Sequence, residues 1–205
     1  MVSRQDAVLN LSHLLTRAPG ASSEAHGEGL LAPSEEEQRH DGVRLDGPLD
    51  WRVTVRGTGG DDDLLADGDV SGTAVQECRR CLTDVRVDVR AEFFYPMVYE
   101  PAGGKALSLI EAPLAEEGDD VATSEGGEDR LAFGKPEVDF ATLLRQLFAI
   151  EMPLTALCTP DCRGLATDGT NLNDHPDHVP EGATDRTEER SPFAALEDLD
   201  LDPRS

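Results

Sequence analysis

The architecture of this 205-residue chain is set by residues 70–96, VSGTAVQECRRCLTDVRVDVRAEFFYP. Residues 70–76 have the β-branched and small residues of a strand, and in residues 85–90 valine alternates with arginine or aspartate. Such alternation is typical of a strand that buries one face. The stretch therefore predicts a β-hairpin whose tip carries two cysteines, Cys78 and Cys81.

Three further segments complete the predicted fold. Residues 8–15 suggest a short strand followed by a turn of helix, and residues 49–55 alternate like a half-buried strand. Apolar residues recur at helical spacing over residues 138–150, with Asp139 placed to cap the first turn. We therefore expect an α+β fold, in which an antiparallel sheet from residues 49–96 packs against one main helix.

A second cysteine pair, Cys158 and Cys162, follows this helix as Cys-Thr-Pro-Asp-Cys. Pairs spaced two or three residues apart can form two knuckles that aim four thiolates at one structural zinc ion. Residues 82–157 separate Cys81 from Cys158, so one shared site requires the fold to bring distant segments together. A reducible disulfide pair and two unrelated free pairs are the other interpretations.

The acidic charge avoids the cysteine segments. The formal net charge is −24, yet residues 51–99 carry only −3 (6 basic, 9 acidic) and residues 141–163 are neutral (2 basic, 2 acidic). Residues 100–140 and 164–205 carry −8 each (3 basic, 11 acidic). Acidic stretches with few apolar residues favour disorder.

We therefore expect one domain over residues 1–178, with flexible inserts at about residues 20–40 and 101–135, and an acidic tail at residues 179–205. No continuous apolar signal or membrane segment is evident, which predicts a cytoplasmic protein without membrane contact. In that reducing compartment, paired cysteines are more often metal ligands or catalysts than disulfides.

The order of motifs resembles the YceD family of bacteria. The motifs that carry this resemblance are Ser71-Gly-Thr-Ala74, Glu77-Cys-Arg-Arg-Cys-Leu82, Phe93-Phe-Tyr-Pro96, Met152-Pro-Leu154, Leu157-Cys-Thr-Pro-Asp-Cys-Arg-Gly-Leu165 and Asn171-Leu-Asn-Asp174. The family often has a further Cys-x-x-Cys-Gly after the last glycine and leucine. Here Ala166 replaces the first of those cysteines and the second is missing. Four cysteines remain, which is enough for one tetrahedral site.

The resemblance implies a factor that supports the synthesis, processing or accumulation of large-subunit ribosomal RNA. No phosphate loop, nucleophile elbow or metalloprotease helix is present, so we expect a non-enzyme. Two alternatives remain open: a dithiol redox protein, and a zinc-knuckle adaptor in transcription.

The expected partner is large-subunit ribosomal RNA, a pre-ribosomal particle, or a basic ribosomal or assembly protein. Arg79, Arg80 and Arg163 lie beside the cysteines and are the candidates for contact with RNA or with the particle. The net charge of −24 opposes broad RNA affinity, which depends on lysine and arginine. The acidic segments favour binding to a basic protein instead. His175 and His178 could be substitute metal ligands, but their polar, proline-broken stretch favours solvent exposure.

Overall fold

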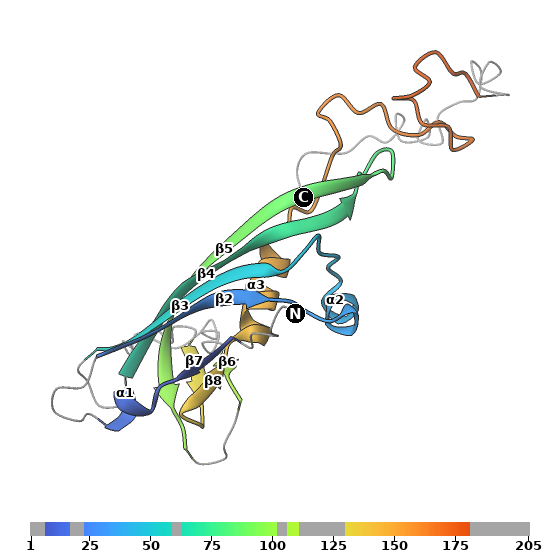
Figure 1. The fold of residues 1–205 in the computed structure, drawn as a ribbon. Helices are drawn as coiled ribbons and strands as arrows, with labels where there is room; N and C mark the ends of the chain where they lie inside the picture. Colours follow the sequence, from blue (N-terminus) through green and yellow to red (C-terminus); the bar gives the residue numbers. More distant parts are fainter. Residues whose placement is uncertain (1–6, 17–22, 59–62, 102–105, 111–129, 181–205) are drawn as a thin grey trace, which may run out of the picture. The chain divides into compact units, whose positions relative to one another are not determined.

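The computed structural model describes residues 7–16, 23–58, 63–101, 106–110 and 130–180 (Figure 1). The chain divides into two compact units. The first unit consists of residues 1–76 and 84–156, and the second consists of residues 77–83 and 157–205.

The described residues form eight strands and three helices. They are β1 (Val8–Asn10), α1 (Ser12–Thr16), β2 (Glu24–Leu31), α2 (Glu35–Asp41), β3 (Leu49–Gly57), β4 (Asp63–Glu77), β5 (Asp84–Tyr99), β6 (Ser108–Ile110), β7 (Arg130–Phe133), β8 (Glu137–Asp139) and α3 (Ala141–Glu151). Among these residues, no helix is long and apolar enough to cross a membrane.

The first unit is built on a six-stranded sheet in the order β2-β3-β4-β5-β7-β6, and β1 pairs with β8 in a separate ribbon. β3 pairs antiparallel with both β2 and β4, and β6 pairs antiparallel with β7. β5 and β7 run parallel, with Met97 opposite Leu131. The predicted α+β class is therefore confirmed, with a mostly antiparallel sheet and one parallel pair.

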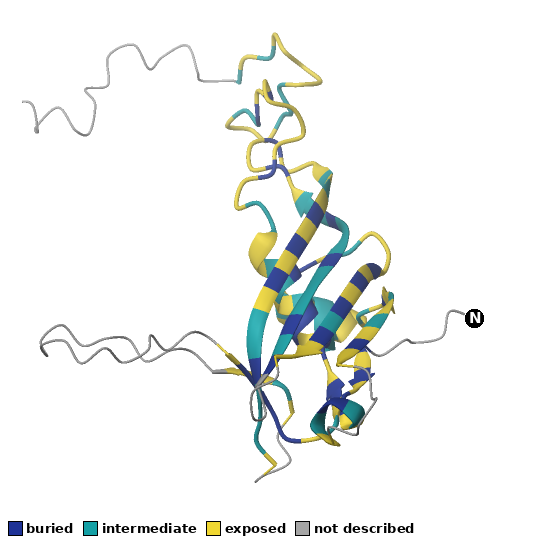
Figure 2. Ribbon diagram, turned by 90° about the vertical axis from the view of Figure 1, so that its left-hand side faces the viewer, coloured by how far each residue is buried: buried dark blue, intermediate teal, exposed yellow. Residues whose placement is uncertain are grey.

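One face of the sheet forms the core with α3 (Figure 1). Buried and exposed residues alternate along the strands, as Figure 2 shows. In β3 the buried residues are Leu49, Trp51, Val53 and Val55, which is the predicted half-buried pattern. Phe148 of α3 is 1% exposed and belongs to the same core cluster. The helix thus uses its apolar face for packing, as expected.

Small residues in β4 make room for this packing. Ala66 and Ala74 are fully buried, and Gly72 lies between them on the same face of the strand. A Cβ atom at Gly72 would lie 2.6 Å from Leu49 Cδ2 and 3.6 Å from Phe148 Cε2. The absence of a side chain at Gly72 therefore lets the large residues of β3 and α3 approach β4.

The expectation of a flexible insert at residues 20–40 is wrong for most of that stretch, because β2 and α2 occupy it. The glycines that suggest flexibility serve packing instead. A Cβ atom at Gly27 would lie 2.8 Å from Leu9 Cδ1 and 3.1 Å from Trp51 Cη2. A glycine at position 27 of β2 therefore makes room for the side chains of Leu9 and Trp51.

The second predicted insert, at residues 101–135, contains the short strands β6 and β7. Leu131 and Phe133 of β7 are almost fully buried. This part of the prediction is therefore wrong, since these apolar residues interrupt the acidic composition. Residues 102–105 and 111–129, and nearly all of the acidic tail at 179–205, lie outside the described residues.

The main helix begins later than predicted. Val138 belongs to β8 and pairs with Leu9 of β1, as the short strand expected at residues 8–15 allows. The helix starts at Ala141, so Phe140 occupies the N-cap position. Asp139 Oδ1 still accepts a hydrogen bond from the backbone N–H of Ala141 at 2.9 Å. Asp139 therefore accepts a hydrogen bond from the first helical N–H, but it does so from the position before the N-cap.

An ion pair joins α2 to α3. The guanidinium of Arg145 donates to Glu37, and its Nε lies 3.1 Å from Asp41 Oδ2. The side chains of Arg145 and Asp41 are each only 12% exposed. Glu37 also completes a capping box with Ser34 at the start of α2. One carboxylate thus fixes the start of α2 and its connection to α3.

The pKa of Glu37 is lowered from 4.5 to about 2, chiefly because the backbone N–H and hydroxyl of Ser34 favour its ionised form, with a further contribution from Arg145. This stabilisation is complete above pH 4.5 and is lost as the pH falls towards 2. Glu37→Gln should therefore lower the free energy of unfolding at pH 7 by about 0.5–1 kcal/mol, a value limited by partial exposure. Denaturant titrations should show the difference from wild type shrinking between pH 4.5 and 2.

Glu36→Gln is the matched control, because Glu36 occupies the same helical turn and is exposed. It removes the same charge from the helix N-terminus, but it leaves the charged contacts of Glu37 with Ser34 and Arg145 intact. Equal losses in the two variants at pH 7 would show that the contacts of the Glu37 charge with Ser34 and Arg145 contribute nothing to stability.

Candidate metal centre

The first cysteine turn is residues 77–83, which connect β4 to β5. Cys78 donates its backbone N–H to the carbonyl of Thr83 at 2.8 Å, and Leu82 donates to the carbonyl of Cys78 at 2.9 Å. Leu82 has a φ of 61°, a left-handed conformation that is uncommon for a bulky residue. These bonds close the predicted turn tightly enough to bring both sulfurs to its inner side.

The second cysteine turn lies against the first within the same unit. The backbone N–H of Cys162 donates to the carbonyl of Thr159, and Arg80 Nη1 donates to the carbonyl of Cys162 at 2.9 Å. Leu165 returns a bond from its N–H to the carbonyl of Arg80 at 3.1 Å. Two segments that are far apart in sequence are thus joined by hydrogen bonds in both directions.

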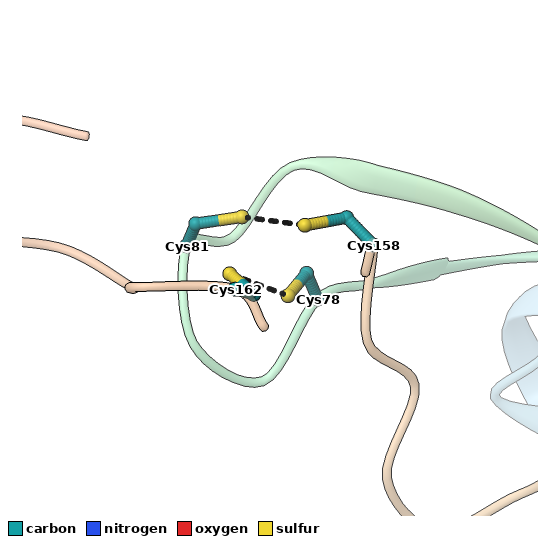
Figure 3. Close-up of side chains that lie close together, drawn as sticks. All are labelled: Cys78, Cys81, Cys158 and Cys162. Atoms are coloured by element: carbon teal, nitrogen blue, oxygen red, sulfur yellow. Dashed lines mark hydrogen bonds between the residues drawn. The ribbon is translucent and has the colours of Figure 1, made fainter. Parts of the chain in front are cut away.

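All four sulfurs meet in one cluster (Figure 3). The Sγ atoms of Cys78 and Cys162 lie 3.8 Å apart, those of Cys81 and Cys158 lie 3.6 Å apart, and all four lie within 4.8 Å of one another. A tetrahedron with zinc–sulfur bonds of about 2.3 Å has edges of about 3.8 Å. Because all four sulfurs share one cluster, the interpretation as two unrelated free pairs is wrong. None of the four cysteines forms a disulfide.

The environment of the cluster favours thiolates on its first turn. The pKa of Cys78 is lowered to about 6, mainly by the backbone N–H of Cys158 and then by that of Cys81. The pKa of Cys81 is lowered by Thr83, whose hydroxyl lies 3.3 Å from the sulfur. In both cases donors aimed at the sulfur favour its charged form.

Cys158 behaves in the opposite way. Its pKa is raised to about 12, chiefly by Cys162 and Cys81, whose sulfurs disfavour one more negative charge in the cluster. Four thiolates within 4.8 Å of one another repel strongly, and a cation at their centre would remove this repulsion. The arrangement is therefore compatible with a bound metal ion.

Two residues near the sulfurs were not predicted to have a role. Thr83 contacts Cys81 as described, and Asn173 Nδ2 donates to Cys162 Sγ at 3.3 Å. The sequence contained one signal for the second contact, since Asn173 belongs to the Asn171-Leu-Asn-Asp174 motif. No spacing rule connects an asparagine to a cysteine eleven positions earlier.

The three candidate arginines all lie exposed in the second unit. Arg80 and Arg163 have internal contacts: Arg80 Nη1 donates to the carbonyl of Cys162, and Arg163 Nη1 donates to the carbonyl of Pro176 at 3.2 Å. Arg79 lies at the tip of the first cysteine turn. The structure thus gathers these arginines beside the cysteine cluster, and it gives two of them a role in holding their own unit together.

The histidines are outside the sulfur cluster. His178 Nε2 lies 2.6 Å from Asp168 Oδ2. The pKa of Asp168 is lowered to about 2, mainly by the backbone N–H of Thr170 and then by His178. The four-cysteine group contains no histidine, and His175 is exposed, as expected.

A comparison with family models finds a match that covers most of the chain. The model described as "Large ribosomal RNA subunit accumulation protein YceD" matches residues 66–200, which is 135 of the 205 residues (200 − 66 + 1) and includes both cysteine turns. No curated protein and no solved structure matches the chain. Because the matched stretch exceeds half of the chain, this protein belongs to the YceD family, whose name denotes accumulation of large-subunit ribosomal RNA.

Proposed function

We propose that this protein is a non-catalytic cytoplasmic factor that supports the synthesis, processing or accumulation of large-subunit ribosomal RNA. The observation that carries the proposal is the family match over residues 66–200, which spans the whole cysteine centre. The family name describes an accumulation factor. The cysteine cluster would serve as a structural element that joins the two halves of the second unit.

Cys78, Cys81, Cys158 and Cys162 would hold one zinc ion. The donor set fits this metal, because four sulfur ligands at tetrahedral spacing select zinc or iron–sulfur centres over magnesium and calcium. Zinc bound by four cysteines has no open position, so it would supply cross-linking rather than catalysis. The hydrogen bonds from Arg80 and Leu165 would align the two turns for this cross-link.

A dithiol redox protein is the second candidate, since a thiol pKa of about 6 at Cys78 resembles that of an activated cysteine. The burial of the cysteine residues argues against it. Cys78 is fully buried, while the exposed Cys158 has the raised pKa. A redox catalyst needs its thiolate accessible to the substrate disulfide. In this centre the cysteine with the lowered pKa is buried, and the exposed cysteine has the raised pKa.

Partner binding would involve the second unit, with Arg79, Arg80 and Arg163 as the candidate contacts. A guanidinium has five N–H donors, so the backbone bonds of Arg80 and Arg163 leave other donors for a phosphate or a carboxylate. The alternative partner is a basic ribosomal or assembly protein, which the net charge of −24 would attract.

Depletion of the protein followed by profiling of ribosomal RNA tests the role. We expect less mature large-subunit RNA relative to small-subunit RNA, with altered precursor levels. A normal ratio with unchanged precursors would overturn the proposal and leave the adaptor in transcription as the better hypothesis.

Charge reversal separates RNA contact from protein contact. Arg79→Glu should weaken binding to large-subunit precursor particles and reduce the salt dependence of binding by about one counterion for each phosphate that is no longer neutralised. Arg86→Glu is the matched control, because Arg86 is an exposed arginine of β5 that pairs with Asp46 in the first unit. Equal binding and salt dependence in wild type and both variants would exclude a phosphate contact at Arg79.

A further inference from the structure

The side chain of Asn173 faces the sulfur of Cys162. Its Nδ2 lies 3.3 Å from Sγ, and Cys162 is only 2% exposed. A sulfur so buried receives little stabilisation from water, so a hydrogen bond from the protein matters more than it would at the surface.

The orientation of this amide is fixed by its neighbours. Asn173 Oδ1 accepts a hydrogen bond from the backbone N–H of Arg163 at 2.9 Å, and Nδ2 also donates to Asn171 Oδ1 at 2.9 Å. A backbone N–H can only donate, so the oxygen of Asn173 must lie on that side. The amide nitrogen must therefore point towards Cys162, and the hydrogen bond from Arg163 decides which end of the amide is the nitrogen.

The surrounding loop holds Asn173 in place. Asn171 Oδ1 accepts from the backbone N–H of Asn173 as well, at 3.0 Å. The N–H of Leu172 donates to the carbonyl of Gly164, and Leu165 and Asn171 form an isolated β-bridge. The loop from Gly164 to Asn173 thus folds back on itself and returns the asparagine to the cysteine turn.

We propose that Asn173 is a positioning residue of the metal centre, and that its amide donates a hydrogen bond to the metal-bound sulfur of Cys162. The proposal rests on the zinc site proposed above. A thiolate keeps much of its negative charge when it binds a metal, and a donor aimed at it both orients the ligand and stabilises that charge. The amide of Asn173 thus contacts the sulfur of Cys162, as the hydroxyl of Thr83 contacts the sulfur of Cys81.

The test compares two isosteric substitutions in the same loop of the full chain. Asn173→Asp replaces the donor beside Cys162 with an acceptor, whereas Asn171→Asp keeps the acceptor oxygen that Asn171 uses. Each adds one negative charge. In competition with a zinc chelator, Asn173→Asp should weaken zinc affinity about 10- to 100-fold, and Asn171→Asp should change it by less than about threefold.

A spectroscopic measurement separates donation to sulfur from general support of the loop. In chains loaded with Co²⁺, loss of the hydrogen bond should shift the sulfur-to-cobalt charge-transfer band in Asn173→Asp and leave it unchanged in Asn171→Asp. Asn173→Ala should shift the band in the same direction as Asn173→Asp, although it adds no charge. The alanine variant therefore tests the hydrogen bond even if the aspartate variant fails to fold.

Equal zinc affinities and unshifted bands in both position-173 variants would overturn the role of Asn173 while leaving the zinc site standing. A wild-type chain that binds neither zinc nor cobalt would instead overturn the zinc site, and the role of Asn173 with it.

Discussion

Serine in place of Cys78 should remove zinc from the protein and unfold the second unit. Cys78 is fully buried, and its sulfur lies 3.8 Å from that of Cys162, so a hydroxyl there leaves three thiolates around an incomplete site. Structural zinc contributes about 10–16 kcal/mol of apparent binding free energy in small zinc domains, and this binding is coupled to folding. Loss of one zinc ligand should therefore destabilise the second unit more than any surface substitution does.

The measurement combines metal analysis with hydrogen exchange. Wild-type protein purified under reducing conditions should contain about one zinc per chain, and Cys78→Ser should contain almost none. Backbone amides of residues 157–180 should lose protection from exchange in this variant. Those of β3 should keep it, because β3 belongs to the separate core of the first unit. Full protection of residues 157–180 in a metal-free variant would show that the unit needs no metal.

A pair of substitutions at Cys158 distinguishes a metal ligand from a redox thiol. Cys158 is exposed, so a larger side chain can be accommodated there. Histidine is a zinc ligand and serine is not, so Cys158→His should retain zinc whereas Cys158→Ser should lose it. The redox hypothesis expects a metal-free wild type with disulfide reductase activity that both substitutions abolish. A wild type that is metal-free, folded and without reductase activity would contradict both hypotheses.

The sequence predicted well those features that depend on local periodicity. The hairpin around the first cysteine turn and the half-buried strand β3 follow from alternation over a few residues. The meeting of the two cysteine pairs was expected for another reason: four thiolates in two tight turns suit one structural zinc site, although a disulfide pair and two unrelated free pairs were also open. Their convergence across residues 82–157 could be stated as a requirement of a shared site, and the 3.6 Å separation of the Cys81 and Cys158 sulfurs meets it.

Features that depend on contacts between distant residues were missed. Arg145 and Glu37 are 108 positions apart, and neither residue type nor spacing connects them. Composition favours a flexible stretch at β2, because its two glycines and two glutamates outweigh its apolar residues. The bulky side chains that require glycine at position 27 come from β1 and β3. The composition of a segment describes only its own residues, whereas these elements are stabilised by contacts with other segments.

Gly68 provides a test of how closely β3 and β4 approach. It lies opposite Val53 in the antiparallel pairing of these strands. A Cβ atom at Gly68 would lie 2.3 Å from the carbonyl oxygen of Arg52 and 2.9 Å from the ring of Phe93. The oxygen belongs to the backbone of the neighbouring strand, so it cannot move away as the end of a flexible side chain could. Alanine at position 68 must therefore displace one strand from the other.

We expect Gly68→Ala to lower the free energy of unfolding by about 3 kcal/mol or more, at the upper end of the range for overpacked cores. Gly57→Ala in β3 is the matched control, because its Cβ atom would lie 3.8 Å from the nearest atom, the carbonyl oxygen of Ser23, which is an ordinary contact. It should change stability by less than about 0.5 kcal/mol. Thermal and denaturant unfolding of both variants measures the difference. If the two alanine variants are equally stable, β4 can shift at Gly68 without loss, and the glycine is not required for the close pairing of the central strands.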